Sequence, residues 1–134
     1  MNILVAEDDP NIRALLEEII NSLGKYKIVA SGGAALDAFE NAWQAGLPYD
    51  AILLDINMPD ISGIEVLKNI RHLEKKKGVS EKMPAQIIMM TAISDKATVI
   101  ACLESGCNDY IVKPFKPVAI VDKLKSLESY IGKN

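Results

Sequence analysis

Groups that can bind a metal ion or a phosphoryl oxygen stand at the ends of four short apolar runs of this chain. In chain order they are Glu7-Asp8-Asp9, Asp55, Thr91 and Lys113. A buried strand that ends in a polar side chain aims that side chain at a crevice along the sheet edge. If the four strands are parallel, acids, a hydroxyl and an ammonium converge there. This combination predicts the handling of a phosphoryl group with the help of a divalent cation.

The apolar runs alternate with segments of helical spacing. Strands are expected at about 3–6, 27–30, 51–55, 87–90 and 110–112. Helices are expected at about 10–23, 33–44, 63–77, 95–105 and 117–130, the last with Val118, Val121, Leu124 and Leu127 facing the core. Alternating strands and helices are typical of a parallel sheet that is covered by helices on both faces. The predicted fold class is therefore α/β, with a single doubly wound sheet.

Composition narrows the classes of protein further. The chain has 134 residues, of which 49% are hydrophobic and 25% charged, as expected of one compact domain. A net charge of -3 offers no basic surface for direct contact with nucleic acid. No apolar stretch approaches the roughly 18 residues of a membrane span, and no signal peptide is visible, so we expect a cytoplasmic protein. Cys102 and Cys107 are then expected to be small core or helix-end residues.

Four motifs, in this order, resemble those of the receiver domain of bacterial two-component response regulators. They are Glu7-Asp8-Asp9, Asp55, Thr91-Ala92 and Lys113-Pro114-Phe115. Each is weak alone, but four in order at the ends of apolar runs are specific. The resemblance extends from Asn2 to about Tyr130 and predicts one receiver domain over residues 1–134. It implies a flavodoxin-like fold of five parallel strands in the order 2-1-3-4-5 with five helices.

The resemblance also implies a role for each side chain of the site. Asp55 becomes the phosphoacceptor, and Lys113 supplies a mobile positive charge to a phosphoryl oxygen. Thr91 donates its hydroxyl to the phosphorylated Asp55, and Tyr110 is the switch aromatic that responds to this movement. The Lys113–Pro114 bond resembles the cis peptide bond of the family.

The cofactor implied by the resemblance is Mg²⁺, with Mn²⁺ as an alternative. Asp8 is expected to bind the ion directly and Glu7 through water, together with Asp55 and the backbone carbonyl of Asn57. The acidic pair of the family can be aligned with Glu7-Asp8 or with Asp8-Asp9. We favour the first alignment because Asp9 precedes a proline and is placed to cap the first helix.

By this resemblance the chain is a phosphoacceptor receiver in a two-component phosphorelay, a signalling protein that catalyses only its own phosphotransfer and slow autodephosphorylation. The implied donor is a histidine kinase or a phosphotransfer protein. The implied output is an effector protein that binds the surface formed by the fourth helix, fifth strand and fifth helix. In receivers the residues two after the acceptor and two after the threonine influence hydrolysis. Here they are Asn57 and Ile93, and Ile93 is expected to slow it.

Two other classes share part of the pattern. A phosphatase of the haloacid dehalogenase type needs a second aspartate two residues after the nucleophile, where this chain has Asn57, and a cap domain for its substrate. A flavodoxin-like cofactor binder needs a loop rich in Ser, Thr and Gly after the first strand, where this chain has three acids. Whether the receiver stands alone or belongs to a longer regulator remains open.

Overall fold

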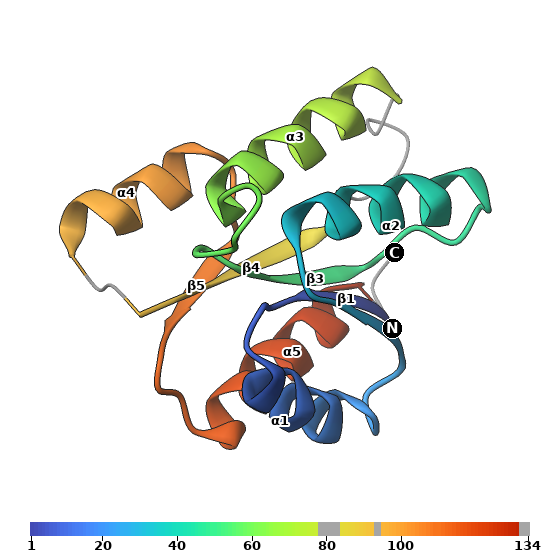
Figure 1. Ribbon diagram of the computed structural model, residues 1–134. Coiled ribbons are helices and arrows are strands. Elements are labelled where there is room, and N and C mark those ends of the chain that lie inside the picture. Colours follow the sequence, from blue (N-terminus) through green and yellow to red (C-terminus); the bar gives the residue numbers. More distant parts are fainter. Residues whose placement is uncertain (78–83, 93–94, 132–134) are drawn as a thin grey trace.

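Five parallel strands form a single sheet in the order β2-β1-β3-β4-β5 (Figure 1). The computed structural model describes residues 1–77, 84–92 and 95–131. The strands are β1 (Asn2–Ala6), β2 (Lys25–Val29), β3 (Ala51–Asp55), β4 (Gln86–Thr91) and β5 (Asp109–Val112). The predicted α/β class is confirmed, and so is the strand order that the resemblance implies.

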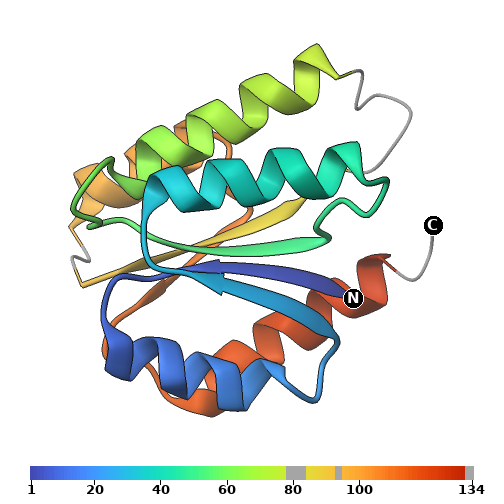
Figure 2. The ribbon, with the colours of Figure 1, turned by 45° about the vertical axis from the view of Figure 1, so that its right-hand side comes forward.

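Five helices cover the two faces of this sheet. They are α1 (Pro10–Ile20), α2 (Gly32–Gln44), α3 (Gly63–Lys76), α4 (Lys96–Glu104) and α5 (Pro117–Ile131). Helices α2, α3 and α4 lie on one face, and α1 and α5 lie on the other (Figure 2). Within the described residues, no helix combines the length and the apolar character needed to cross a bilayer.

The core consists of two apolar layers, because alternate side chains of each strand point to opposite faces. Leu54 belongs to the layer beneath α2, α3 and α4, and Leu53 to the layer above α1 and α5. Every residue of β3 and β4 is buried, which explains why these strands appear in the sequence as continuous apolar runs. Cys102 and Cys107 are buried free thiols in the first layer, as the sequence predicts.

Three details of the sequence prediction are wrong. Helix α1 ends at Ile20 rather than at residue 23, because the chain tightens into a turn in which the Leu23 N–H donates to the Ile20 carbonyl at 2.9 Å. Strand β2 starts at Lys25 rather than at residue 27, because it pairs with the whole of β1. Val118 is 58% exposed, whereas Leu124 is fully buried, since the buried face of α5 lies on the other side of the helix from Val118.

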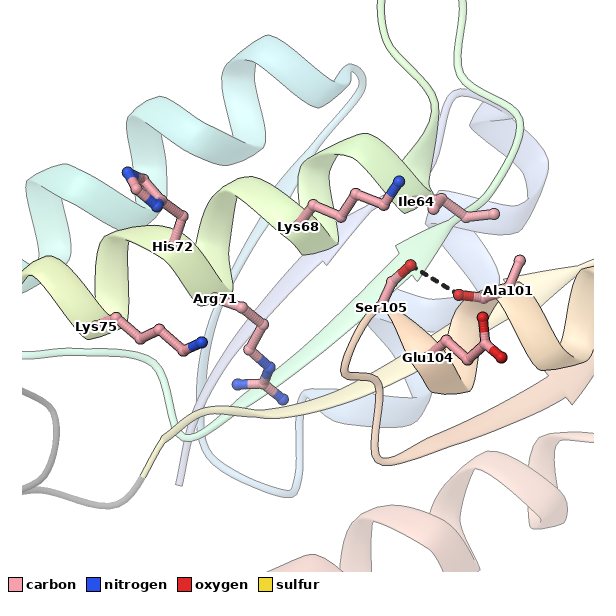
Figure 3. A pocket seen from close by; sticks show the side chains of 8 residues that line it. All are labelled: Ile64, Lys68, Arg71, His72, Lys75, Ala101, Glu104 and Ser105. Atoms are coloured by element: carbon pink, nitrogen blue, oxygen red, sulfur yellow. Dashed lines mark hydrogen bonds between the residues drawn. The ribbon is translucent and has the colours of Figure 1, made fainter.

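Arg71 fastens α3 to the sheet edge at which β4 and β5 begin. Its guanidinium donates to the carbonyls of Gly106 and Ala85, both at 2.9 Å, and to the Asn108 side-chain oxygen at 2.9 Å. It also donates to Glu74 at 2.7 Å, and this carboxylate, only 2% exposed, accepts from the Ala85 N–H at 2.8 Å. Figure 3 shows Arg71 in the groove of about 500 Å³ between α3 and α4. The network therefore joins three segments through one charged side chain.

We expect Arg71→Ala to lower the free energy of unfolding by about 3 kcal/mol, because it leaves the buried Glu74 carboxylate without its cation. Lys68→Ala is the matched control. The Lys68–Glu65 pair, on the same helix, is solvent-exposed with a separation of 3.7 Å, and its loss should cost about 0.5 kcal/mol or less. Urea unfolding of both variants measures the difference. Equal destabilisation by the two substitutions would contradict this role of Arg71.

Candidate functional site

Three carboxylates meet where β1 and β3 end side by side. The site is formed by Glu7, which is fully buried, by Asp55, which is 3% exposed, and by the solvent-exposed Asp8. One oxygen atom from each of the three lies within 4.8 Å of the others. Carboxylate oxygens at this spacing are the donors that a hard divalent cation prefers. The residues present therefore fit a metal ion, and the cluster joins the three acids predicted from the sequence.

Lys113, which directly follows the edge strand β5, brings one positive charge into this cluster. Its Nζ donates to Oε1 of Glu7 at 2.5 Å and lies 3.1 Å from Oδ1 of Asp55. Its backbone N–H donates to the carbonyl of Thr91 at 2.7 Å, which fixes the segment after β5 against the end of β4. The Lys113–Pro114 peptide bond is cis, as the resemblance implies.

The cluster carries more negative charge than Lys113 can balance. Burial raises the pKa of Asp55 to about 7, and the charge of Glu7 acts in the same direction against the hydrogen bond from Lys113. Burial by itself lowers the pKa of Lys113, but hydrogen bonds to Glu7 and Asp55 outweigh it, so that this pKa is raised overall. A further cation at the site would relieve the repulsion between the two buried carboxylates.

The loops on either side of the cluster hold its members in place. Asp9 caps α1 by accepting from the Asn11 N–H at 2.8 Å, and its own N–H donates to Oε2 of Glu7 at 3.1 Å. Asp9 thus serves as the predicted helix cap, in agreement with the alignment of the acidic pair on Glu7-Asp8. In the loop after β3, the Asn57 N–H donates to Oδ1 of Asp55 at 3.3 Å.

Thr91 and Tyr110 lie on the same face of the sheet, on neighbouring strands. Thr91 pairs with Val112 and Met89 with Tyr110, so that the two predicted switch residues are diagonal neighbours. Thr91 is 2% exposed, and the half-buried Tyr110 packs against the apolar layer beneath α2, α3 and α4. Ile93, the residue expected to slow hydrolysis, lies outside the described residues.

Arg13 is a residue of the site that sequence reasoning did not find. Its Nη1 donates to the carbonyls of Glu7 at 3.0 Å and Asp8 at 2.8 Å, and so holds the turn that presents both acids. From sequence, an arginine on the first turn of an amphipathic helix is expected to be solvent-exposed. No motif or spacing distinguishes Arg13 from such a surface residue. The groove between α3 and α4, in contrast, is lined by none of the predicted site residues (Figure 3).

Comparison with known proteins identifies the family of a chain with this fold and this site. A family model described as the response regulator receiver domain matches residues 3–125. The chain therefore belongs to the response regulator receiver domain family, and it is a phosphoacceptor signalling domain of the two-component type.

Particular relatives span almost all of the chain. Chemotaxis protein CheY1 of Helicobacter pylori is 32% identical over 125 residues, which cover 93% of this chain and 94% of CheY1. A chain from the complex of the Saccharomyces cerevisiae phosphotransfer protein Ypd1 with the receiver domain of Ssk1 is 32% identical, with a TM-score of 0.81; 95% of this chain and 88% of that chain are covered. A chain from the CheX–CheY–BeF3–Mg²⁺ complex of Borrelia burgdorferi is 27% identical, with a TM-score of 0.79 and coverages of 96% and 89%.

We expect Asp55→Asn to raise the free energy of unfolding by on the order of 1 kcal/mol at neutral pH in the presence of a chelator, because it removes one of two neighbouring buried negative charges. Excess Mg²⁺ should shrink this difference, since an ion that binds only the folded parent stabilises it. Urea unfolding with and without the chelator measures both effects. Asp9→Asn, which makes the same charge change at a helix cap, should alter stability little. A variant less stable than the parent in the chelator would refute the expected repulsion.

Proposed function

We propose that Asp55 accepts the phosphoryl group, from a phosphohistidine on a histidine kinase or a phosphotransfer protein. The observation that carries the proposal is the burial of this carboxylate at the end of a central strand, between two acids and the ammonium of Lys113. The match to a receiver crystallised with the phosphotransfer protein Ypd1 supports a donor of this kind. Residues 1–134 would act as one receiver domain, in the cytoplasm.

Mg²⁺ is the proposed cofactor, with Mn²⁺ able to use the same oxygen donors. Asp8, Asp55 and the backbone carbonyl of Asn57 would hold the ion, and Glu7 would do so through water. When bound, the ion supplies the positive charge that offsets the carboxylates and the incoming phosphoryl oxygens. The presence of Mg²⁺ in the similar CheX–CheY complex supports this choice.

The chain's own residues position an in-line displacement. An oxygen of Asp55 forms a bond to phosphorus while the bond from phosphorus to the donor's imidazole nitrogen breaks, and the electron pair remains on that nitrogen. Lys113, already 3.1 Å from Asp55, donates to a phosphoryl oxygen in place of a carboxylate oxygen. Thr91 donates its hydroxyl to another phosphoryl oxygen. Slow attack of water on phosphorus later releases phosphate and restores the carboxylate.

Asp55 should gain one phosphoryl group from acetyl phosphate in the presence of Mg²⁺ or Mn²⁺ and not after chelation, because the acids repel an anion until a cation binds. Intact-mass spectrometry measures the gain, and peptide mapping locates it. Asp9→Asn, outside the carboxylate cluster, is the control and should be labelled like the parent. Equal labelling of Asp55→Asn, or labelling that a chelator does not reduce, would overturn the assignment.

The surface of α4, β5 and α5 is the proposed output face toward an effector protein. Helices α4 and α5 flank the edge strand β5 from opposite faces of the sheet. Among the side chains that the structure describes on these two helices, three large apolar ones are exposed: Ile100 at 41%, Leu103 at 49% and Val118 at 58%. In α4 only Cys102 is buried, so this helix makes few buried contacts with the rest of the domain. Exposed apolar side chains beside polar ones suit a protein partner, and the net charge of -3 does not suit nucleic acid.

The proposed link between Asp55 and this face runs through Thr91 and Tyr110. When Thr91 moves toward a phosphoryl oxygen, it vacates space on the face that it shares with Tyr110, and the ring can fill that space by changing rotamer. A hydrogen bond to a charged group is worth about 1.5 to 3 kcal/mol. That free energy shifts a two-state equilibrium by roughly one to two decades. Both states should therefore be populated to some extent without phosphate.

Thr91→Ala should leave Asp55 able to accept a phosphoryl group but uncouple it from the output face, because the variant lacks the hydroxyl that reports phosphorylation. Amide chemical shifts with and without beryllofluoride and Mg²⁺ measure the response of residues 95–130. Thr91→Ser, which keeps the hydroxyl, is the matched control and should respond like the parent. A parent-like response of Thr91→Ala would show that this coupling route is wrong.

A further inference from the structure

The loop between β3 and α3 is tied to the start of α2 by the side chain of Asp60. Its carboxylate accepts from the backbone N–H of Gly32 at 3.0 Å and from that of Gly33 at 2.7 Å. These two donors lie in the first turn of α2, where no helical carbonyl is available to them. The third amide of that turn, Ala34, is capped by Ser31 at 3.2 Å. Asp60 thus caps a helix to which it does not belong, and the two hydrogen bonds lower its pKa.

Close packing accompanies this charged contact. A Cβ atom on Gly32 would lie 2.4 Å from Cγ1 of Ile61 and 2.9 Å from Cγ2 of Val66, so only glycine admits the loop at this distance. One on Gly33 would lie 3.1 Å from Oδ2 of Asp60 itself. The first turn of α2 is therefore shaped to receive the loop, and the Asp60 carboxylate fixes the loop against it.

The same loop carries Asn57, three residues before Asp60. The ends of the loop are fixed, since the Ile56 N–H donates to the Met90 carbonyl at 3.0 Å and the Gly63 N–H donates to the Ile56 carbonyl at 2.7 Å. Between these ends, Asp60 supplies an anchor to a different part of the chain. A backbone carbonyl binds Mg²⁺ well only when it is held in direction, because this ion demands near-ideal octahedral geometry.

We infer that Asp60 is a positioning residue for the metal site: by clamping the loop to α2, it holds the Asn57 carbonyl toward the ion. The inference rests on the proposed function, in which Asn57 contributes that carbonyl. Asp60 itself does not bind the ion and does not touch the phosphoryl group. Its two hydrogen bonds act on Asn57 through the two residues between them, Met58 and Pro59.

Asp60→Ala should weaken Mg²⁺ binding about tenfold, in the range typical of groups that orient a metal ligand. The measurement is a titration of the full chain with MgCl2, followed by backbone amide shifts. Without metal, amide hydrogen exchange should also become faster in the loop 57–61. A loss of global stability alone would instead accelerate exchange over the whole chain. Asp60→Asn keeps one acceptor oxygen and should fall between the parent and Asp60→Ala.

Ser31→Ala is the matched control, because it removes a hydrogen bond from the same turn of α2 without touching the loop. It should lower stability but leave the Mg²⁺ affinity unchanged. The inference is overturned if Asp60→Ala binds Mg²⁺ as the parent does, or if Ser31→Ala weakens binding as much as Asp60→Ala. A parent that does not bind Mg²⁺ would overturn the proposed metal site together with this inference, whereas normal binding in Asp60→Ala would overturn the inference alone.

Discussion

Two carboxylates buried next to each other, with one ammonium between them, are the constraint on which the rest of this structure depends. Burial raises the pKa of Asp55, and the negative charge of Glu7 raises it further, because the single ammonium of Lys113 does not offset both carboxylates. A site of this kind favours the arrival of further positive charge. The fold forms this cluster because the carboxyl ends of parallel strands lie at the same edge of the sheet. Residues that are far apart in sequence are thereby brought together.

The rest of the molecule offsets the unfavourable electrostatics of that edge. Strands β3 and β4 are buried throughout, and apolar layers on both faces of the sheet supply the stabilisation that a cluster of acids cannot. At the opposite edge, Arg71 satisfies Glu74 and three further acceptors, so a buried charge there is fully partnered. The charges at this edge of the sheet are therefore compensated, while the edge proposed to carry out phosphoryl transfer keeps an excess of negative charge.

Sequence reasoning predicted the parts that depend on local pattern. Continuous apolar runs predicted the buried strands. The acids and Lys113, which stand at the ends of these runs, were predicted to meet, and the structure brings them together. It failed where tertiary contacts decide. The full length of β2 follows from its pairing with β1, and the exposure of Val118 follows from the way α5 meets the sheet. Arg13 and Asp60 were missed because their partners are backbone groups outside their own element, which local residue types do not indicate, in contrast to Asp9, which caps its own helix.

Helix α4 buries little of its surface against the sheet, and this bears on how such proteins diversify. Because only Cys102 of this helix is buried, its outer residues can be exchanged with little effect on the core or on the carboxylates at the strand ends. If α4 belongs to the output face proposed above, partner choice and phosphoryl chemistry are encoded in separate sets of residues. On that proposal, duplicated copies of such a chain would keep the same reaction while substitutions on α4 give them different partners, so that signals in one cell do not cross.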